Sequence, residues 1–128
     1  MGRPEGTIEK HFIQIAEKHG YQYFKFTSPS KAGVPDRLII GHGTSMFVEL
    51  KAPGEEPRLL QREQFRRMRR DGAQIYVLDT KPIVDEFFAT LLAHTRADGF
   101  LSDEARLNLA PWRKVMNKYI EKPPGGDK

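Results

Sequence analysis

The feature that most constrains the fold is a set of four short apolar stretches, each bounded by residues that favour turns. They span residues 21–26, 37–40, 46–50 and 74–78. Stretches this short, rich in aromatic and β-branched side chains, are typical of strands. The second and third are separated only by residues 41–45, a Gly-His-Gly-Thr-Ser segment that favours a hairpin turn. A helix-length segment separates the third from the fourth, and a right-handed crossover would make those two strands parallel in a mixed sheet.

Three amphipathic segments supply the expected helices. Thr7 is the predicted cap of the first helix, which Gly20 ends. Pro57 lies in the first turn of the second, which runs to about Asp71. Asp79 or Thr80 caps the third, which runs from Lys81 to about Arg96. The order of elements is then helix, three strands, helix, strand and helix. This order predicts an α/β fold with a mixed central sheet flanked by helices.

The composition excludes several classes of protein. The chain has 128 residues and no cysteine, which rules out a disulfide, a thiolate zinc site and a cysteine nucleophile. Its longest apolar runs fall far short of the roughly 20 residues that a membrane span needs. The first residues also lack the apolar core of a signal peptide. We therefore expect a cytoplasmic, intracellular protein of one ordinary domain with no membrane partner.

The positive charge of the chain is concentrated in one segment. The formal net charge is +4, from 21 Lys and Arg against 17 Asp and Glu. Residues 58–70 alone hold six arginines and one glutamate, so the rest of the chain is close to neutral. A cationic helix face suits a polyanionic partner, although a charge run is more often a solvated face. The near absence of intervening acidic residues favours nucleic acid.

Three charged side chains occupy positions where a core sheet would not place them without reason. Asp36 precedes the second strand, and Glu49 and Lys51 flank Leu50 at the end of the third. Alternation puts Glu49 and Lys51 on one face and Leu50 on the other. A hairpin would bring Asp36 close to Glu49, giving two carboxylates of the kind that hold Mg²⁺ or Mn²⁺ beside an ammonium group. The spacing of Glu49 and Lys51 alone also fits a surface pair on a half-exposed strand.

The combined motifs closely resemble the VRR-NUC family of the PD-(D/E)xK nuclease superfamily. The resemblance is carried by GVPDRLI at residues 33–39, FVELKAPG at residues 47–54, Gln61, and GAQIYV at residues 72–77. It covers about residues 7–92 and implies a restriction-endonuclease-like core. Phage, bacterial and eukaryotic repair proteins belong to this family, so a phage protein acting in a bacterial host fits the expectation.

The resemblance also implies roles for particular residues. Asp36 and Glu49 match the metal-binding carboxylates, Lys51 matches the catalytic lysine, and the backbone carbonyl of Leu50 would complete the metal shell. The implied cofactor is Mg²⁺ or Mn²⁺, with no small-molecule cofactor. Gln61 matches a family glutamine, and its spacing from Phe65 and Met68 points its amide toward the sheet; a glutamine that merely caps the core is the alternative.

Two further groups of polar residues are expected near the substrate. Glu9 matches an acidic residue of the first family helix. It shares a helix face with Ile13 and Ala16, which places it within reach of the metal or its water; a solvated helix glutamate is the alternative. Phosphate contacts are predicted for Lys25, Ser28 and Ser30 and, along the arginine-rich helix, for Arg62, Arg66, Arg69 and Arg70. His42, in the hairpin turn, is expected to be solvated.

We therefore expect a metal-dependent, structure-selective DNA endonuclease that hydrolyses phosphodiester bonds. Stand-alone family members resemble Holliday-junction resolvases, which implies branched DNA as the substrate and a homodimer with two active sites. The alternatives are a non-catalytic DNA-binding module and a flap or duplex endonuclease. Residues 1–96 are expected to form the nuclease domain, and residues 97–128 a helical C-terminal extension with a flexible tail.

Overall fold

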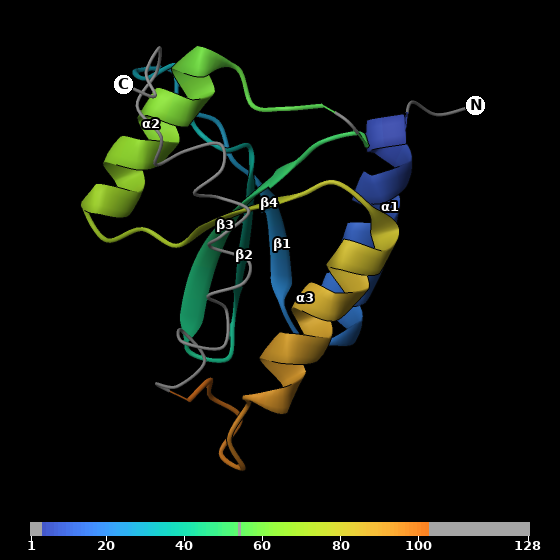
Figure 1. The fold of residues 1–128 in the computed structure, drawn as a ribbon. Coiled ribbons are helices and arrows are strands. Elements are labelled where there is room, and N and C mark those ends of the chain that lie inside the picture. Colours follow the sequence, from blue (N-terminus) through green and yellow to red (C-terminus); the bar gives the residue numbers. More distant parts are fainter. Residues whose placement is uncertain (1–3, 54, 103–128) are drawn as a thin grey trace, which may run out of the picture.

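The computed structural model describes residues 4–53 and 55–102, which form a four-stranded sheet and three helices (Figure 1). The elements in chain order are α1 (Pro4–Lys18), β1 (Gln22–Lys25), β2 (Arg37–Gly41), β3 (Thr44–Leu50), α2 (Leu59–Arg70), β4 (Ile75–Leu78) and α3 (Lys81–Ala93). This is the predicted order. No helix in the described part of the chain has both the length and the apolar character needed to cross a membrane.

The sheet has the predicted mixed topology, with strand order β1-β2-β3-β4. Both β1 and β3 are antiparallel to β2, and the crossover through α2 makes β4 parallel to β3. The turn between β2 and β3 has two central residues, His42 and Gly43, with φ of 52° and 79°. Positive φ at both positions is what a two-residue hairpin with right-handed twist requires, which explains the glycine.

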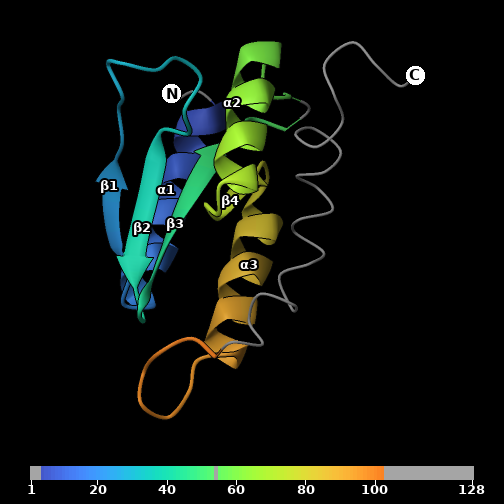
Figure 2. The same ribbon diagram turned by 90° about the vertical axis from the view of Figure 1, so that its left-hand side faces the viewer.

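The helices cover the two faces of the sheet unequally. α1 and α3 lie together on one face, and α2 lies on the other (Figures 1 and 2). The larger core lies under α1 and α3, where Phe12, Ile39 and Phe88 are fully buried. A smaller core lies under α2, where Phe65 packs against Ile75. Each strand therefore buries alternate residues on opposite faces, and this alternation determines which side chains can meet at the site.

Two helices begin at residues other than the predicted ones, and the third begins as predicted. α1 begins at Pro4, so Thr7 lies inside the helix and does not cap it; proline suits a first turn because it has no backbone N–H to satisfy. α2 begins at Leu59, because Arg58 has an extended backbone and precedes the first helical residue. α3 is capped by Thr80, whose hydroxyl accepts a hydrogen bond from the backbone N–H of Ile83, as predicted.

The chain turns back soon after α3, which ends at Ala93 and not near residue 96. A single antiparallel bridge joins Thr95 to Leu101, and the backbone N–H of Leu101 donates to the carbonyl of His42. The helical extension was predicted over residues 97–128; residues 97–102 form no helix, and residues 103–128 lie outside the described residues. The proposed division of the chain near residue 96 stays a prediction.

The ring of His42 is engaged in contacts and is not simply solvated, contrary to expectation. Its Nε2 lies 2.6 Å from the carbonyl oxygen of His19, and its Nδ1 lies 2.7 Å from that of Gly99. The ring also contacts Tyr21. The turn between β2 and β3 is thus tied to the end of α1 and to the loop after α3, at the end of the sheet away from Glu49.

Candidate active site

The candidate site lies where β2 begins, β3 ends and α2 begins. The pairing of Arg37 with Val48 continues in the antiparallel direction to place Asp36 beside Glu49. Glu49 is only 3% exposed, and it lies on the face of β3 that is covered by α2. The hairpin expected from the sequence therefore brings these two carboxylates together.

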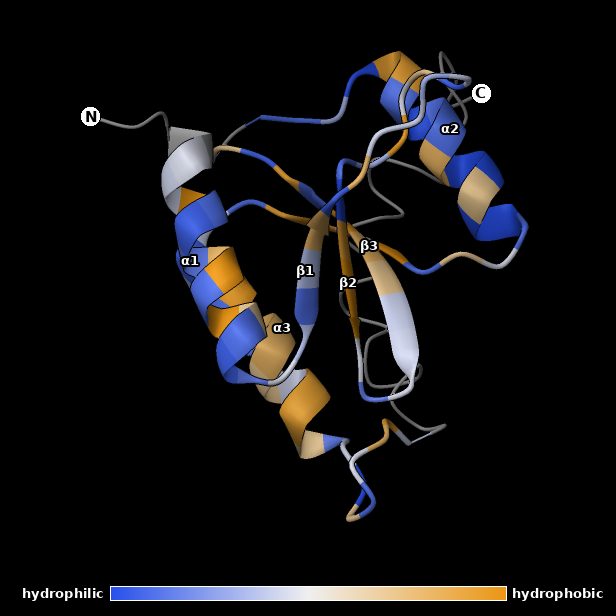
Figure 3. Ribbon diagram, turned by 180° about the vertical axis from the view of Figure 1, so that it is seen from behind, coloured by the Kyte–Doolittle hydropathy of each residue, from blue (hydrophilic) through white to orange (hydrophobic). Residues whose placement is uncertain are grey.

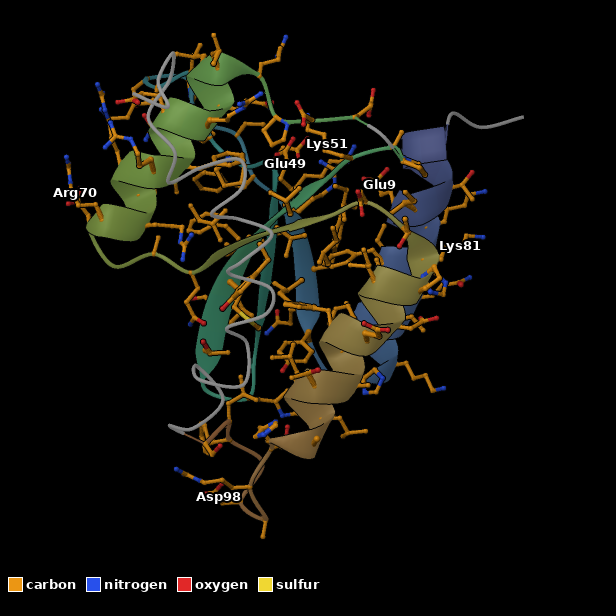
Figure 4. The ribbon with its side chains drawn as sticks, viewed as in Figure 1. Glu9, Glu49, Lys51, Arg70, Lys81 and Asp98 are labelled. Atoms are coloured by element: carbon orange, nitrogen blue, oxygen red, sulfur yellow. The ribbon has the colours of Figure 1, made fainter. Side chains whose placement is uncertain are left out.

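Glu49, Lys51 and Gln61 form a closed triangle of polar contacts. Nζ of Lys51 lies 3.1 Å from Oε2 of Glu49. The side-chain amide of Gln61 donates to that same oxygen at 3.3 Å, while its Oε1 accepts a hydrogen bond from Lys51 at 3.2 Å. Figure 4 shows Glu49 and Lys51 close together near the start of α2. The side chain of Leu50 is buried on the opposite face, as the alternation of a strand predicts.

The first turn of α2 fixes the position of Gln61. Oε1 of Gln61 also accepts a hydrogen bond from the backbone N–H of Arg58, at 2.9 Å. That N–H precedes the helix and would otherwise lack an intrahelical partner. Gln61 is 9% exposed and so points toward the sheet, as its spacing predicted. It therefore both caps the helix and bridges Glu49 to Lys51. Its part in the reaction stays a prediction.

The two carboxylates each keep one oxygen that is ready for a cation. Oδ1 of Asp36 and Oε1 of Glu49 are both buried, and neither has a hydrogen-bond partner among residues 4–53 and 55–102. Burial raises the pKa of Glu49, and the charge of Asp36 raises it further, while Lys51 acts in the opposite direction. Unsatisfied buried carboxylate oxygens cost several kcal/mol unless a cation or proton satisfies them. Two hard oxygen donors are what Mg²⁺ and Mn²⁺ prefer, so the residues fit such an ion.

The number of protein ligands at this position is small. Within residues 4–53 and 55–102, no group of three or more His, Asp or Glu side chains is placed to hold a metal. Any ion would therefore combine Asp36 and Glu49 with backbone oxygen and water. The carbonyl of Leu50 remains the predicted backbone ligand.

Glu9 lies in a second set of contacts beside the first. Its Oε2 lies 2.8 Å from Nη2 of Arg37 and accepts a hydrogen bond from the hydroxyl of Tyr23 at 2.9 Å. Lys25 approaches the same oxygen at 3.9 Å. Arg37 also pairs with Oδ2 of Asp36 through Nη1, at 2.5 Å. The role of Glu9 as a metal ligand stays a prediction.

Sequence analysis missed Arg37 and Tyr23. A signal for Arg37 was present, because it directly follows Asp36 and shares the inward face of β2 with Ile39. An arginine at such a position needs carboxylate partners if it is to be buried. The contact partner of Tyr23 could not be derived from periodicity alone, because it lies on α1.

The predicted phosphate-binding residues around the β1–β2 loop do not contact the triangle. Lys25 has a largely exposed side chain, and its ion-pair partner is Glu9. Ser28 and Ser30 lie in the loop between β1 and β2, and no side-chain hydrogen bond of either is present within the described residues. Their phosphate-binding roles stay predictions.

The α2 helix is strongly hydrophilic over much of its length (Figure 3). Several of its arginines pair with acidic neighbours: Arg66 and Arg67 with Glu63, Arg62 with Glu56, and Arg70 with Asp71. Figure 4 shows Arg70 at the end of α2 that lies far from Glu49. The arginines thus extend from the site along the helix, over about 12 Å from Arg62 to Arg70 at a rise of about 1.5 Å per residue. The sequence did not reveal how many of them have local acidic partners.

The fold and the arrangement of the site define a restriction-endonuclease-like α/β protein of the PD-(D/E)xK type. A solved structure described as "VRR_NUC domain" superposes on the chain with a TM-score of 0.64 at 27% identity. The match covers 69% of this chain and 97% of that one.

A curated relative leads to the same family. "Putative nuclease p44" of Acyrthosiphon pisum secondary endosymbiont phage 1 is 42% identical over 80 residues, which are 62% of this chain and 86% of that protein. No family model matches the chain. Together the two matches show that the chain belongs to the VRR-NUC family of nucleases.

Proposed function

We propose that this protein is a metal-dependent DNA endonuclease that hydrolyses phosphodiester bonds with Mg²⁺ or Mn²⁺. The observation that carries the proposal is a pair of buried oxygens, one on Asp36 and one on Glu49, that have no hydrogen-bond partner in the described part of the chain, together with the ammonium group of Lys51 that contacts Glu49. In a surface ion pair, water would satisfy the carboxylate oxygens, and no cation would be needed. Membership of a nuclease family supports the same reaction class.

Asp36 and Glu49, with the carbonyl of Leu50, would hold the divalent ion. When bound, the ion supplies Lewis-acid chemistry, lowering the pKa of a water and neutralising charge on the phosphate. The carboxylates have to be ionised for this role. Because burial and Asp36 raise the pKa of Glu49 and the metal binds the ionised carboxylate, we expect metal binding to strengthen as pH rises.

Lys51 would act on the reacting phosphate and its attacking water. Its Nζ is held by an oxygen of Glu49 on one side and by Gln61 on the other. An ammonium group oriented in this way, in a partly desolvated site, stabilises the negative charge that develops on phosphorus-bound oxygens. Gln61 contributes by fixing the position of Lys51 relative to Glu49.

The arginines of α2 would bind the DNA backbone outside the reacting centre. Arg62, Arg66, Arg69 and Arg70 offer guanidinium groups that pair well with phosphate. Each phosphate contact releases counterions, and binding would therefore weaken steeply with salt, with a slope near −0.9 per contact on duplex DNA. The acidic neighbours of these arginines would be exchanged for phosphates on binding.

The finer part of the proposal concerns the shape of the substrate. Resemblance to junction-resolving members of the family favours branched DNA such as a four-way junction, cut by a homodimer. The sequence has no zinc finger, basic zipper or RRM string, which favours recognition of phosphate geometry over base sequence. Flap and duplex cleavage remain the alternatives.

The test compares labelled four-way junction, flap and linear duplex substrates with Mg²⁺, with Mn²⁺ and with EDTA, alongside the native mass. We expect metal-dependent cleavage with a preference for the junction, by a dimer. Binding without cleavage in either metal would favour the non-catalytic DNA-binding module. A monomer that cuts only flaps would overturn the junction-resolving version.

A further inference from the structure

Arg37 joins two carboxylates that the sequence assigned to one metal centre. It is only 6% exposed, and its two terminal nitrogens point to different partners. Nη1 contacts Oδ2 of Asp36, and Nη2 contacts Oε2 of Glu9 at 2.8 Å. A nearly buried guanidinium between two carboxylates is costly to remove from water and needs both partners.

This pairing makes the two oxygens of Asp36 inequivalent. Oδ2 is committed to Arg37, whereas Oδ1, like Oε1 of Glu49, is buried and has no hydrogen-bond partner within the described residues. We propose that Arg37 is a positioning residue that fixes which oxygen of Asp36 faces the metal, with Glu9 as its anchor and not as a ligand. The inference rests on the proposed function, because it concerns the same centre.

The geometry requires an arginine because one side chain has to hold two carboxylates from different elements. Asp36 lies in the loop before β2, and Glu9 lies on α1, which covers the face of the sheet opposite α2. A guanidinium is a rigid fork whose separate N–H groups can bind both carboxylates at once. A lysine has the same charge, but its ammonium group is a point charge on a flexible stem.

Glu9 is itself held in the position that an anchor needs. The Oε2 that meets Arg37 also accepts the hydroxyl hydrogen of Tyr23. Glu9 thus has a donor and a cation already in place. No three acidic or histidine side chains within the described ranges are arranged as a metal group, which agrees with a role outside the metal shell.

The experiment measures binding of Mn²⁺ alone to the full chain by electron paramagnetic resonance. Arg37→Lys keeps the positive charge, so a change in Mn²⁺ affinity reports the loss of the two-pronged guanidinium contact and not a change in electrostatic repulsion. We expect Arg37→Lys to weaken Mn²⁺ binding by about 10-fold, within the 10- to 100-fold range typical of residues that orient metal ligands. The matched control is Arg96→Lys, whose ion pair with Asp98 lies at the opposite end of the molecule (Figure 4); its affinity should equal that of the wild type.

The outcomes separate this inference from the proposed function. Wild-type protein that binds no Mn²⁺, or that binds equally well with Glu49→Gln, overturns the proposed metal centre itself. If Asp36→Asn abolishes Mn²⁺ binding but Arg37→Lys leaves it unchanged, the proposed metal centre stands and the positioning role of Arg37 is wrong. Cleavage should show the same division, with Arg37→Lys lowering kcat while the KM for DNA stays unchanged.

Glu9→Gln completes the test and covers the case in which Arg37→Lys does not fold. If Glu9 is an anchor, Glu9→Gln should lower the Mn²⁺ affinity several-fold less than Asp36→Asn does. The affinity falls because Arg37, without its ion pair to Glu9, interacts more strongly with Asp36. The anchor role also predicts that Glu9→Gln adds nothing in the Arg37→Lys background, as expected for residues that act through one another. A loss equal to that of Asp36→Asn would make Glu9 a ligand, and no loss at all would exclude it as an anchor.

Discussion

Lys51 and Glu49 form a largely buried ion pair at the end of β3, with Nζ 3.1 Å from Oε2. Gln61 contacts both members and is itself fixed by the first turn of α2. The pair occupies one oxygen of Glu49 and leaves the other free. One oxygen of Glu49 therefore contacts Lys51, and the other is the oxygen proposed to bind the metal ion.

Lys51→Met should slow cleavage by about 10²- to 10³-fold while leaving DNA binding largely intact. Methionine keeps the length of the stem but removes the charge next to the reacting phosphate. Removing one preorganised electrostatic group typically costs 10²- to 10³-fold in rate. Single-turnover cleavage and electrophoretic binding of the same junction measure the two properties. A variant that cuts at the wild-type rate would show that Lys51 has no part in the reaction.

Gln61→Ala should lower both stability and cleavage. The substitution removes the acceptor for the backbone N–H of Arg58 and leaves Lys51 with one partner fewer. Loss of one capping or buried hydrogen bond costs about 1 kcal/mol. Urea denaturation and cleavage assays should be run in parallel. Gln64→Ala, on the same helix and outside these contacts, is the matched control and should change neither property appreciably.

The pH dependence of the metal-free protein should report the environment of Glu49. Its pKa is raised in the folded state by burial and then by Asp36, so the folded protein binds this proton more tightly than the unfolded chain does. The stabilisation is fully present below the unfolded pKa, about 4.3, and is lost as pH rises through the raised native pKa. Chemical denaturation in EDTA between pH 4 and 8 should show that the free energy of unfolding falls more steeply with rising pH for the wild type than for Glu49→Gln.

A suitable comparison for that experiment is Glu86→Gln, because Glu86 is exposed on α3. Its pH profile should run parallel to that of the wild type. If Glu49→Gln also gives a parallel profile, Glu49 does not have the raised pKa that its burial implies.

Gly33→Ala should destabilise the protein more than Gly72→Ala does. Both glycines have positive φ, of 81° and 106°. A Cβ at Gly33 would lie 2.8 Å from the carbonyl oxygen of Leu60, whereas one at Gly72 would meet nothing within 4 Å. We expect a loss of about 1–3 kcal/mol at Gly33, since backbone strain and a backbone clash add. Chemical denaturation of both variants measures the difference, and equal losses would mean that the contact with Leu60 is unimportant.

The sequence predicted the fold well where local signals were strong. Short apolar stretches and the turn at residues 41–45 specified the hairpin, and the helical crossover specified the parallel pairing of β3 with β4. The start of α1 was misplaced because Thr7 is a good capping residue, but Pro4 begins the helix one turn earlier. Cap preferences rank single residues and cannot decide between two possible starts.

The contacts of the site were predictable only in part. Alternation along β3 placed Glu49 and Lys51 together, and helix spacing aimed Gln61 at the sheet. The contacts of Arg37 with Glu9 and Asp36 were not predicted, because they depend on how α1 packs across the end of β2. Such packing joins residues distant in the chain, and no local pattern encodes it.

The most direct test of the central claim is the rate of junction cleavage as a function of Mg²⁺ concentration, for wild-type protein and for Glu49→Gln. We expect the wild-type rate to rise with Mg²⁺ to saturation and to fall to background in EDTA, and we expect the rate of Glu49→Gln at saturating metal to be lower than that of the wild type by at least about 10²-fold. A wild-type rate that persists in EDTA, or a Glu49→Gln variant that cuts as fast as the wild type, would contradict the central claim.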